Sequence, residues 1–268
     1  MAISNHELKQ RFNPEGSLLR RLQLRQLELL VELDRICRKH GIDYWLTAGT
    51  LLGAVRHGGF IPWDDDLDVG IDIKDYRRLL KILPGELPPN MALQCNETDE
   101  NYFFEFAKIR DRDSHMEEPH HYDSVFAEQG IYIDILPFEQ SPMWLHRLSN
   151  VAHGRTFKIM RTSKRPVERK MRSVRRINKF CRRVVYPTLR ALARLLPGGC
   201  YHFSFGTPFF TFHARDEVFP LGSIEFEGRS FPAPGDSDRF LRMIYGDYMQ
   251  LPDLDKLAPH VETVTFTR

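Results

Sequence analysis

Apolar residues recur along residues 18–40 with the spacing of one helical face. The run LLRRLQLRQLELLVELDRICRKH places its apolar side chains on a single stripe, at Leu19, Leu22, Leu29, Leu30, Leu33, Ile36 and Cys37. A period of about 3.6 residues predicts an amphipathic helix, and Gly41 is a residue at which such helices commonly end. Two further helices are predicted, a short one in LLGAVRH with its N-terminus at Thr50, and one over 75–84 that ends at Pro84-Gly85.

Strand patterns alternate with these helices. In DLDVGI (66–71) the apolar residues Leu67, Val69 and Ile71 alternate with polar ones, so Asp66 and Asp68 are expected to share one face of a strand. The other strand candidates are IDYWL (42–46), FFEFAKIRD (103–111) and GIYIDILPF (130–138), the last stopping at Pro137. This order of elements predicts a central sheet in an α/β or α+β chain, of which we take α+β as the fold class.

The second half of the chain has a different character. Residues 144–196 are predicted to be helical, and past Gly198-Gly199 the sequence favours short strands and loops, with a small helix around Ser237–Tyr245. No internal repeat or low-complexity linker divides the chain. We therefore predict a single domain over 1–268 with a helical basic segment, about 144–196, inserted into it.

Composition narrows the class of protein. With 42% hydrophobic and 28% charged residues, the 268-residue chain has the composition of a folded protein. Its four cysteines form no CxxC pair, which argues against a disulfide framework or a zinc knuckle and favours a reducing compartment. No run of 18 apolar residues or apolar signal core is present. We expect a cytoplasmic protein, with peripheral attachment to the inner face of the membrane as an extension of that expectation.

The candidate chemistry lies in GTLLGAVRHGGFIPWDDDLDVGI (49–71), which places Asp64, Asp65, Asp66 and Asp68 within five positions. Carboxylates this close repel one another unless a cation neutralises them. Asp66 and Asp68 on one strand suit Mg²⁺ or Mn²⁺, and Asp134, the one acid in an apolar run, is the candidate third ligand. The turn at Gly49 and Thr50 opens a helix whose free N–H groups can hold a phosphate.

Two simpler interpretations of the acidic run fit the sequence less well. A solvated acidic loop leaves the glycine-rich turn unexplained, and an EF-hand fails because Val69 stands where glycine is needed and Asp75 where glutamate is needed. His57 is a candidate turn or phosphate-adjacent residue, since no second ligand lies at metal-binding spacing. Lys108 and Arg110 share one strand face and could neutralise a diphosphate, although ordinary surface charge explains them nearly as well.

The 49–71 run resembles the signature of the LicD family, whose members are similar to nucleotidyltransferase-fold enzymes and include fukutin and fukutin-related protein. The resemblance continues in FEFAKIRD, in GIYIDILPFE and in FEGRSFPAPGDSDRFLRMIYGDYMQLP with His260 after it. It implies a nucleotidyltransferase-like mixed sheet flanked by helices. It further implies that Gly49 and Thr50 form the family's phosphate-contacting turn, that Asp66 and Asp68 are its metal pair and Asp134 its third acid, and that Asp64 and Asp65 belong to the same motif.

The resemblance also implies an activity. The expected enzyme is a metal-dependent phosphotransferase that moves a phosphoalcohol, phosphocholine above the others, from a CDP-linked donor such as CDP-choline to a sugar hydroxyl of a cell-surface glycan. Lipopolysaccharide, capsule and teichoic acid are acceptors of this type. Two other classes stay open: a metal-dependent glycosyltransferase using a nucleotide sugar, and a non-catalytic module that binds an anionic glycan or a membrane.

Charge along the chain is strongly uneven. From Arg155 to Arg194 there are 15 Lys or Arg and one acid, a balance of +14, so with +2 overall the remainder carries −12. Within this segment RRINKFCRRVV sets apolar residues at helical spacing among arginines, which suits an anionic membrane surface and a lipid-linked acceptor. A solvated basic face is the alternative. No nucleic-acid partner is expected, because no RNA-binding module accompanies the charge.

Overall fold

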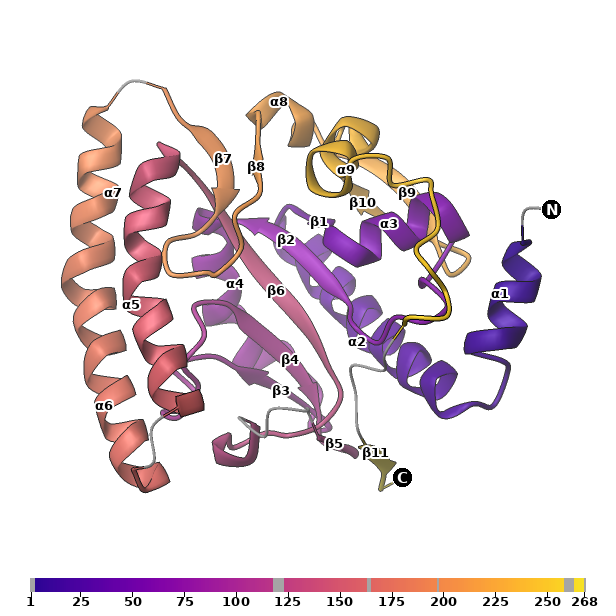
Figure 1. The fold of residues 1–268 in the computed structure, drawn as a ribbon, viewed down its shortest axis with the longest axis horizontal. Helices are drawn as coiled ribbons and strands as arrows, with labels where there is room; N and C mark the ends of the chain where they lie inside the picture. The colour runs from indigo at the N-terminus through magenta and orange to yellow at the C-terminus, as the bar shows by residue number, and fades with distance from the viewer. Residues whose placement is uncertain (1–2, 118–122, 163–164, 197, 258–262, 268) are drawn as a thin grey trace.

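The computed structural model describes residues 3–117, 123–162, 165–196, 198–257 and 263–267. Its main sheet is organised around β6 (Tyr132–Ser141), the longest strand described. On one side of β6 lies β2 (Asp68–Asp72), in parallel, followed by β1 (Tyr44–Leu46) in antiparallel pairing. The sheet is therefore mixed, as the α+β prediction requires (Figure 1).

The other side of β6 is shared by two antiparallel strands. β4 (Ala107–Asp111) pairs with its first half and β7 (Cys200–Phe203) with its second half. β3 (Met91–Gln94) continues the sheet beyond β4, and β8 (Phe212–His213) continues it beyond β7. Two small antiparallel pairs lie apart from this sheet: β9 (Gly222–Phe226) with β10 (Arg229–Ala233), and β5 (Ser114–Glu117) with β11 (Thr263–Phe266).

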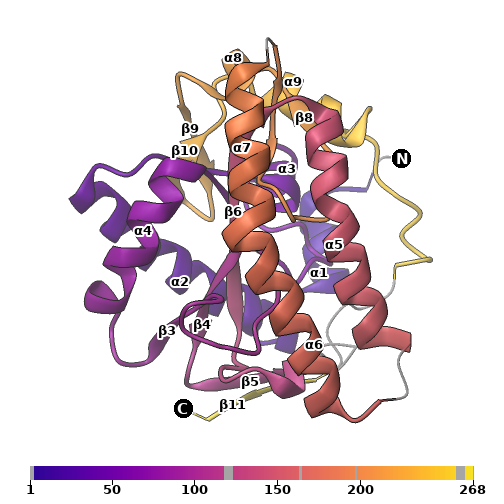
Figure 2. The ribbon, with the colours of Figure 1, turned by 90° about the vertical axis from the view of Figure 1, so that its left-hand side faces the viewer.

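Helices cover the sheet on both faces. They are α1 (Asn5–Phe12), α2 (Leu18–His40), α3 (Ala48–His57), α4 (Ile73–Glu86), α5 (Met143–Thr162), α6 (Val167–Phe180), α7 (Tyr186–Leu195), α8 (Arg215–Val218) and α9 (Ser237–Tyr245), with a 3-10 turn at Asp123–Val125. α5 stands beside α6 and α7 on one side of the molecule, and α3, α9 and the β9–β10 hairpin gather on the opposite side (Figures 1 and 2). Among the described residues, no helix is both long and apolar enough to cross a membrane.

The predicted amphipathic helix is confirmed as α2. Its apolar stripe is buried from Leu22 to Cys37, and Gly41 ends it in the left-handed conformation, with φ 57°. The same buried face carries two amides, Gln23 and Gln26, both fully buried. Polar side chains so placed need partners, and these two find them at the site described below.

Gly70, in the middle of β2, makes room for an indole ring. A Cβ at this position would lie 2.4–2.8 Å from the ring atoms of Trp45, which is itself fully buried. Trp45 continues into an aromatic cluster with Phe138 and Phe219, at centroid distances of 5.3 and 5.7 Å. The glycine is therefore required by a close approach.

Several predicted boundaries were wrong. α3 begins at Ala48, ahead of Thr50; β2 begins at Asp68, so Asp66 precedes the strand; and β4 begins only at Ala107. Phe103 and Phe104 instead pack into a separate aromatic cluster around Phe126, with the Phe103 and Phe126 ring centroids 5.6 Å apart, whereas Phe106 joins the main core. α4 runs through Pro84 to Glu86, because a proline in the last turn forfeits only one helical hydrogen bond.

β6 likewise does not stop at Pro137 but continues to Ser141. The carbonyl of Pro137 accepts a hydrogen bond of 2.7 Å from the N–H of Ser204, so the missing N–H of the proline faces the same edge. On that edge the β4 register ends at Ile135 and the β7 register begins at Phe138. Pro137 falls between the two ladders, where the sheet loses little from an absent donor.

The basic segment is helical, as predicted, over α5, α6 and α7, with a π turn at Cys181–Val185 joining the last two. Its expected apolar stripe is divided between core and surface. Cys181 is buried and Ile177 packs against it, whereas Phe180 and Val184 are 59% and 47% exposed. Packing therefore uses one part of the stripe and leaves the other part at the surface.

His153 on α5 supplies a test of this packing. Burial lowers the pKa of its imidazole to about 4, and its Nε2 has no hydrogen-bond partner among the described residues. An unfolded histidine titrates near 6.5, so it takes up a proton before the folded one, and stability falls as pH drops from about 6.5 to about 4. His153→Phe should match or exceed the wild-type free energy of unfolding at pH 7, and its advantage should widen over that pH range, measured by urea denaturation. A constant difference across the range would contradict the assignment.

Candidate active site

The acidic motif folds into two adjoining groups of carboxylates. Asp68, the first residue of β2, lies opposite Asp134 in the parallel register of β2 and β6. In the loop just before β2, Asp64, Asp65 and Asp66 each offer one oxygen, and these three oxygens lie within 4.8 Å of one another. The structure thus places all five predicted acids at one end of β2.

Electrostatics ties the two groups together. Burial raises the pKa of the Asp68 carboxyl well above its usual range, and the charges of Asp134, Asp66 and Asp64 raise it further, in that order. Lys108 opposes the effect. Because three carboxylates act on a fourth, a divalent cation bound among them would relieve the repulsion.

The donors are all carboxylate oxygens, which is the ligand set that Mg²⁺ and Mn²⁺ prefer. The residues present therefore fit such an ion. The closest three-carboxylate group is Asp64, Asp65 and Asp66, whereas the sequence predicts Asp66, Asp68 and Asp134 as ligands; Asp66 is common to both sets. That ligand set stays a prediction.

Two cations on β4 border the acids. Lys108, 4% exposed, places its Nζ 2.8 Å from Asp134 Oδ1 and 3.2 Å from the centroid of the Tyr132 ring. Arg110 is fully buried beneath the same ring, where its Nε donates to Gln94 and its Nη1 to the carbonyl of Gly130, both at 2.8 Å. Neither is ordinary surface charge: Lys108 faces the acids, and Arg110 supports the ring beside it.

The N-terminus of α3 lies against the acidic loop. A Cβ on Gly49 would lie 2.8 Å from Asp64 Oδ2, so only glycine lets this carboxylate approach the first turn. Thr50, one residue on, accepts a 2.8 Å hydrogen bond at its hydroxyl from the N–H of Asp68. Ala48, which directly precedes Gly49, has φ 47°. Residues other than glycine adopt this conformation at a cost, and mostly at functional positions. The first amides of α3 have no acceptor within the helix, which suits an anion.

Two buried glutamines position the loop, and the sequence analysis missed both. Gln23 donates to the carbonyls of Ile61 and Asp64, at 3.3 and 2.8 Å. Gln26 donates to the carbonyls of Asp65 and Tyr132, at 2.7 and 3.1 Å, and so joins the acidic loop to β6. The sequence signal that could have identified them was the presence of two amide side chains on the otherwise apolar face of α2.

Gln26→Leu tests this support. The substitution keeps the volume but leaves two buried carbonyls without their donor, so we expect a loss of about 2 kcal/mol in the free energy of unfolding. We also expect weaker Mn²⁺ binding, measured by electron paramagnetic resonance, because the loop is no longer held to β6. Gln10→Leu, at an exposed position of α1, is the matched control. Unchanged Mn²⁺ affinity in the folded Gln26 variant would refute the positioning role.

Tyr245, the last residue of α9, is a further residue that the sequence analysis did not select. Tyr245 is 42% exposed, but desolvation raises the pKa of its phenol and the charges of Asp68 and Asp64 raise it further, so the ring lies within electrostatic reach of the acids. Arg56 on α3 holds the following segment through bonds of 2.9 and 3.3 Å to the carbonyls of Tyr248 and Gln250. The signal for Tyr245 was its place in the quoted run MIYGDYMQLP.

His57 is engaged elsewhere. Its Nε2 accepts a 2.9 Å hydrogen bond from Arg56, so its Nδ1 carries the proton and donates to Asn5 at 2.7 Å. Burial, followed by the charge of Arg56, lowers the pKa of the imidazole to about 4. Both nitrogens face protein partners, so substrate binding by His57, which remains a prediction, would require one bond to break. His260 lies outside the described residues.

A sheet that presents paired carboxylates beside a helix N-terminus can hold a divalent cation next to an anion such as phosphate. Residues 41–173 match the family model described as LicD/FKTN/FKRP, nucleotidyltransferase domain. Residues 41–173 therefore form a domain of the LicD family.

Relatives of known name agree with this family. The chain is 28% identical over 257 residues to lipopolysaccharide cholinephosphotransferase LicD of Haemophilus influenzae, covering 90% of this chain and 95% of the relative. It is 60% identical over 35 residues to human ribitol 5-phosphate transferase FKRP, which is 13% of this chain and 7% of FKRP. It is 32% identical over 87 residues to mouse ribitol-5-phosphate transferase FKTN, 32% of this chain and 16% of FKTN. The chain thus spans only small parts of the two ribitol phosphate transferases.

Proposed function

We propose that this protein is a phosphotransferase that moves a phosphoalcohol, with phosphocholine favoured, from a CDP-linked donor to a sugar hydroxyl of a cell-surface glycan, releasing CMP. The observation that carries the proposal is the cluster of Asp64, Asp65, Asp66, Asp68 and Asp134 at the N-terminus of α3. The near full-length match to a lipopolysaccharide cholinephosphotransferase supports the phosphocholine donor and the glycan acceptor.

In this proposal the chain positions two substrates and balances charge. The amides of Gly49 and Thr50 face the donor diphosphate, and Asp66 and Asp68, with Asp134, would hold Mg²⁺ or Mn²⁺. When bound, such an ion neutralises the diphosphate and the departing CMP. Lys108 offsets the charge of Asp134 at 2.8 Å, which leaves that carboxylate able to orient the acceptor hydroxyl.

The transfer itself is a displacement at phosphorus. The acceptor oxygen bonds to the phosphorus that carries the alcohol, the bond from that phosphorus to the CMP oxygen breaks, and the hydroxyl proton passes to an aspartate of the cluster. Rate enhancement then comes from positioning and electrostatics, as in phosphoryl transfer generally.

A donor panel tests this function. Binding of CDP-choline, CDP-ribitol, CDP-glycerol, CDP-ethanolamine and several UDP-sugars would be measured by calorimetry with Mg²⁺ and with EDTA, using Asp66→Asn and Asp68→Asn as controls. We expect metal-dependent binding of one CDP compound that both variants lose. Binding of UDP-sugars alone would favour a glycosyltransferase. If no nucleotide bound, either with Mg²⁺ or with EDTA, a non-catalytic module would be favoured.

The helical segment supports a second part of the proposal, docking to an anionic membrane surface that carries a lipid-linked acceptor. Large apolar side chains are exposed where α5 begins and α7 ends: Trp144 at 55%, Leu148 at 52% and Leu195 at 81%. These helix ends lie at the same end of the segment (Figure 1). Arg147 and Arg194 flank them on the same helices, a combination that suits an anionic interface.

Trp144→Ser with Leu195→Ser tests the docking. We expect the double variant to bind vesicles containing phosphatidylglycerol about tenfold more weakly than wild type in flotation, because two apolar anchors are removed. The matched control is Leu18→Ser with Met249→Ser, which are 49% and 55% exposed elsewhere. If the two double variants float alike, the helical segment is not the docking surface.

A further inference from the structure

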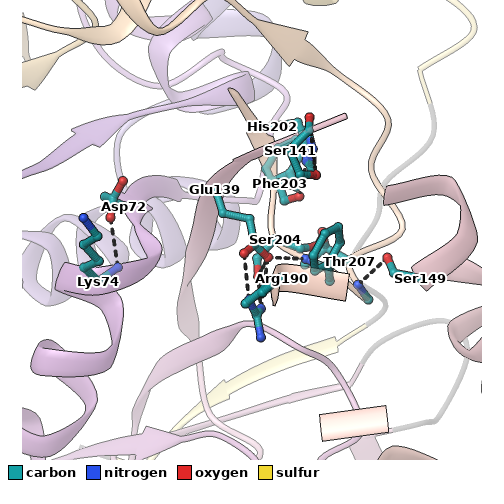
Figure 3. Close-up of polar contacts among 12 residues, drawn as sticks. Asp72, Lys74, Glu139, Ser141, Ser149, Arg190, His202, Phe203, Ser204 and Thr207 are labelled. Atoms are coloured by element: carbon teal, nitrogen blue, oxygen red, sulfur yellow. Dashed lines mark hydrogen bonds and ion pairs between the residues drawn. The ribbon is translucent and has the colours of Figure 1, made fainter. Parts of the chain in front are cut away.

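A second cavity, of about 900 Å³, lies at the other end of β2 from the acids. It is bounded by the N-terminus of α4, the second half of β6, the C-terminal turns of α7, and the start of α8. Figure 3 shows part of its wall, with Asp72 and Lys74 on one side and Glu139 and Arg190 on the other. None of the five acids of the candidate active site lines it.

Aromatic packing separates this cavity from the acids. Asp68 and Asp72 lie on the same face of β2, but between them stands Gly70, against which the Trp45 ring packs. Trp45 contacts Phe138 and Phe219, and Phe138 stacks on Tyr201 with centroids 5.7 Å apart. Two ligands could therefore occupy the two sites without sharing contacts.

Cations dominate the lining of the cavity. Six positive and four negative side chains line it, a balance of +2: Lys74, Arg77, Arg78, Arg190, Arg194 and Arg215 against Asp43, Asp72, Asp75 and Glu139. The six positive side chains come from three helices far apart in the sequence, α4, α7 and α8. The fold, and not one basic run, assembles them.

Three of the four acids already have partners. Glu139 accepts from Arg190 Nε at 2.7 Å, from the Ser204 hydroxyl at 2.7 Å and from the Phe205 N–H at 2.8 Å (Figure 3). Asp72 accepts from the N–H of Lys74 and from the hydroxyl of Tyr201, and Asp75 pairs with Arg78 at 2.6 Å. Two of the acids, Glu139 and Asp75, are thus paired with a cation of the cavity, which leaves Asp43 and Asp72 against the other four cations.

Four cations, by contrast, form no ion pair within the part of the chain that the structure describes: Lys74, Arg77, Arg194 and Arg215. Arg77 shows the consequence: although the residue is exposed, partial desolvation and the charge of Arg190 lower the pKa of its guanidinium, with Arg194 acting in the same direction. Guanidinium groups that line one cavity are stabilised by an anion that accepts from several of them at once.

Apart from Gln140, the rest of the wall is apolar or aromatic, including Ile73, Leu196, Tyr201 and Phe219. Arg215 lies over the Phe219 ring, 4.5 Å from its centroid, and so is held at the edge of the cavity. A wall of this kind packs against an organic group attached to the anion.

We propose that this cavity is a second ligand site, which binds a phosphate ester through Arg77, Arg190 and Arg194 and packs the esterified group against Phe219 and Leu196. The ligand class is a phosphorylated sugar or a comparable small phosphate ester. Binding there needs no divalent cation and no turnover at the acidic cluster.

Calorimetry of the full chain in EDTA tests the proposal with three probes: glucose 1-phosphate, pyrophosphate and glucose. We expect both anions to bind, glucose 1-phosphate more tightly, and glucose not to bind. Arg77→Gln with Arg194→Gln should weaken both anions by at least about tenfold, since two charge-assisted contacts are lost. Both side chains are exposed and unpaired in the described structure, so the variant should fold; circular dichroism and melting temperature check this.

Two controls make the result specific. Arg147→Gln with Arg155→Gln removes the same charge from exposed positions of α5 and should leave binding unchanged. Asp68→Asn should also leave anion binding in EDTA unchanged. Without a metal the acidic cluster repels anions, so it contributes nothing to the binding that is measured. Loss of binding in Asp68→Asn, equal weakening by both arginine pairs, or absence of anion binding to wild type would each overturn the proposal. None of these outcomes depends on which donor the acidic cluster uses.

Discussion

Asp68→Asn should lower turnover by about three orders of magnitude or more while making the folded protein no less stable. Asp68 lies at the point where the charges of Asp134, Asp66 and Asp64 converge. Its raised pKa means that the fold disfavours the charged carboxylate, so a neutral amide of the same shape removes a cost to folding. The same change removes a predicted metal ligand, which is why activity and stability should move in opposite directions.

The measurement pairs single-turnover transfer with thermal unfolding in EDTA. Asp134→Asn is the informative comparison, because it leaves the buried Lys108 ammonium without the carboxylate 2.8 Å away and should lower the melting temperature as well as activity. Wild-type turnover in Asp68→Asn would remove this residue from the reaction. A lower melting temperature in that variant would mean that its carboxylate stabilises the metal-free fold.

Gly70→Ala should destabilise the protein by about 3 kcal/mol or more, the largest effect on stability that we expect from a single methyl group. The added Cβ would lie 2.4–2.8 Å from the Trp45 ring, where real atoms do not approach, and the indole cannot retreat because Phe138 and Phe219 pack against it. Urea denaturation measures the change.

Gly85→Ala is the matched control. A Cβ at Gly85, on α4, has no neighbour within 4 Å, and alanine favours the helix over glycine. This variant should be unchanged or slightly more stable. If Gly70→Ala were equally well tolerated, the close approach of Trp45 to β2 would be wrong.

Local patterns predicted the elements better than their ends. The period of α2 and the alternation of Leu67, Val69 and Ile71 reflect which face is buried, and both held in the structure. The predicted ends of helices and strands were wrong where a distant segment decides whether the element continues. Pro137 lies within β6 because the edge it faces changes partner there, and that change depends on the placement of β7, some sixty residues later.

The acids of the site were predictable because four of them are adjacent in sequence and Asp134 stands alone among apolar residues. The groups that position them were not, since each acts across a long sequence separation. Gln26 reaches the carbonyl of Tyr132 106 residues away, and Tyr245 approaches Asp68 from the last helix. Lys108 was ambiguous in the sequence because a lysine on a strand looks the same whether it faces water or a carboxylate.

β6 also fixes the distance between the acidic cluster and the second cavity. Asp134 at its first half and Glu139 at its second half border the acidic cluster and the second cavity, and five residues of extended strand span about 17 Å. The rise per residue of a strand within a sheet changes very little, so this separation cannot adapt to the ligand. Because Trp45 and Phe138 pack between the two places, a single molecule that engaged both at once would have to pass around these rings. It would therefore carry its two anionic groups at least that far apart, so the length of β6 sets a minimum spacing for substituents along a chain-like substrate.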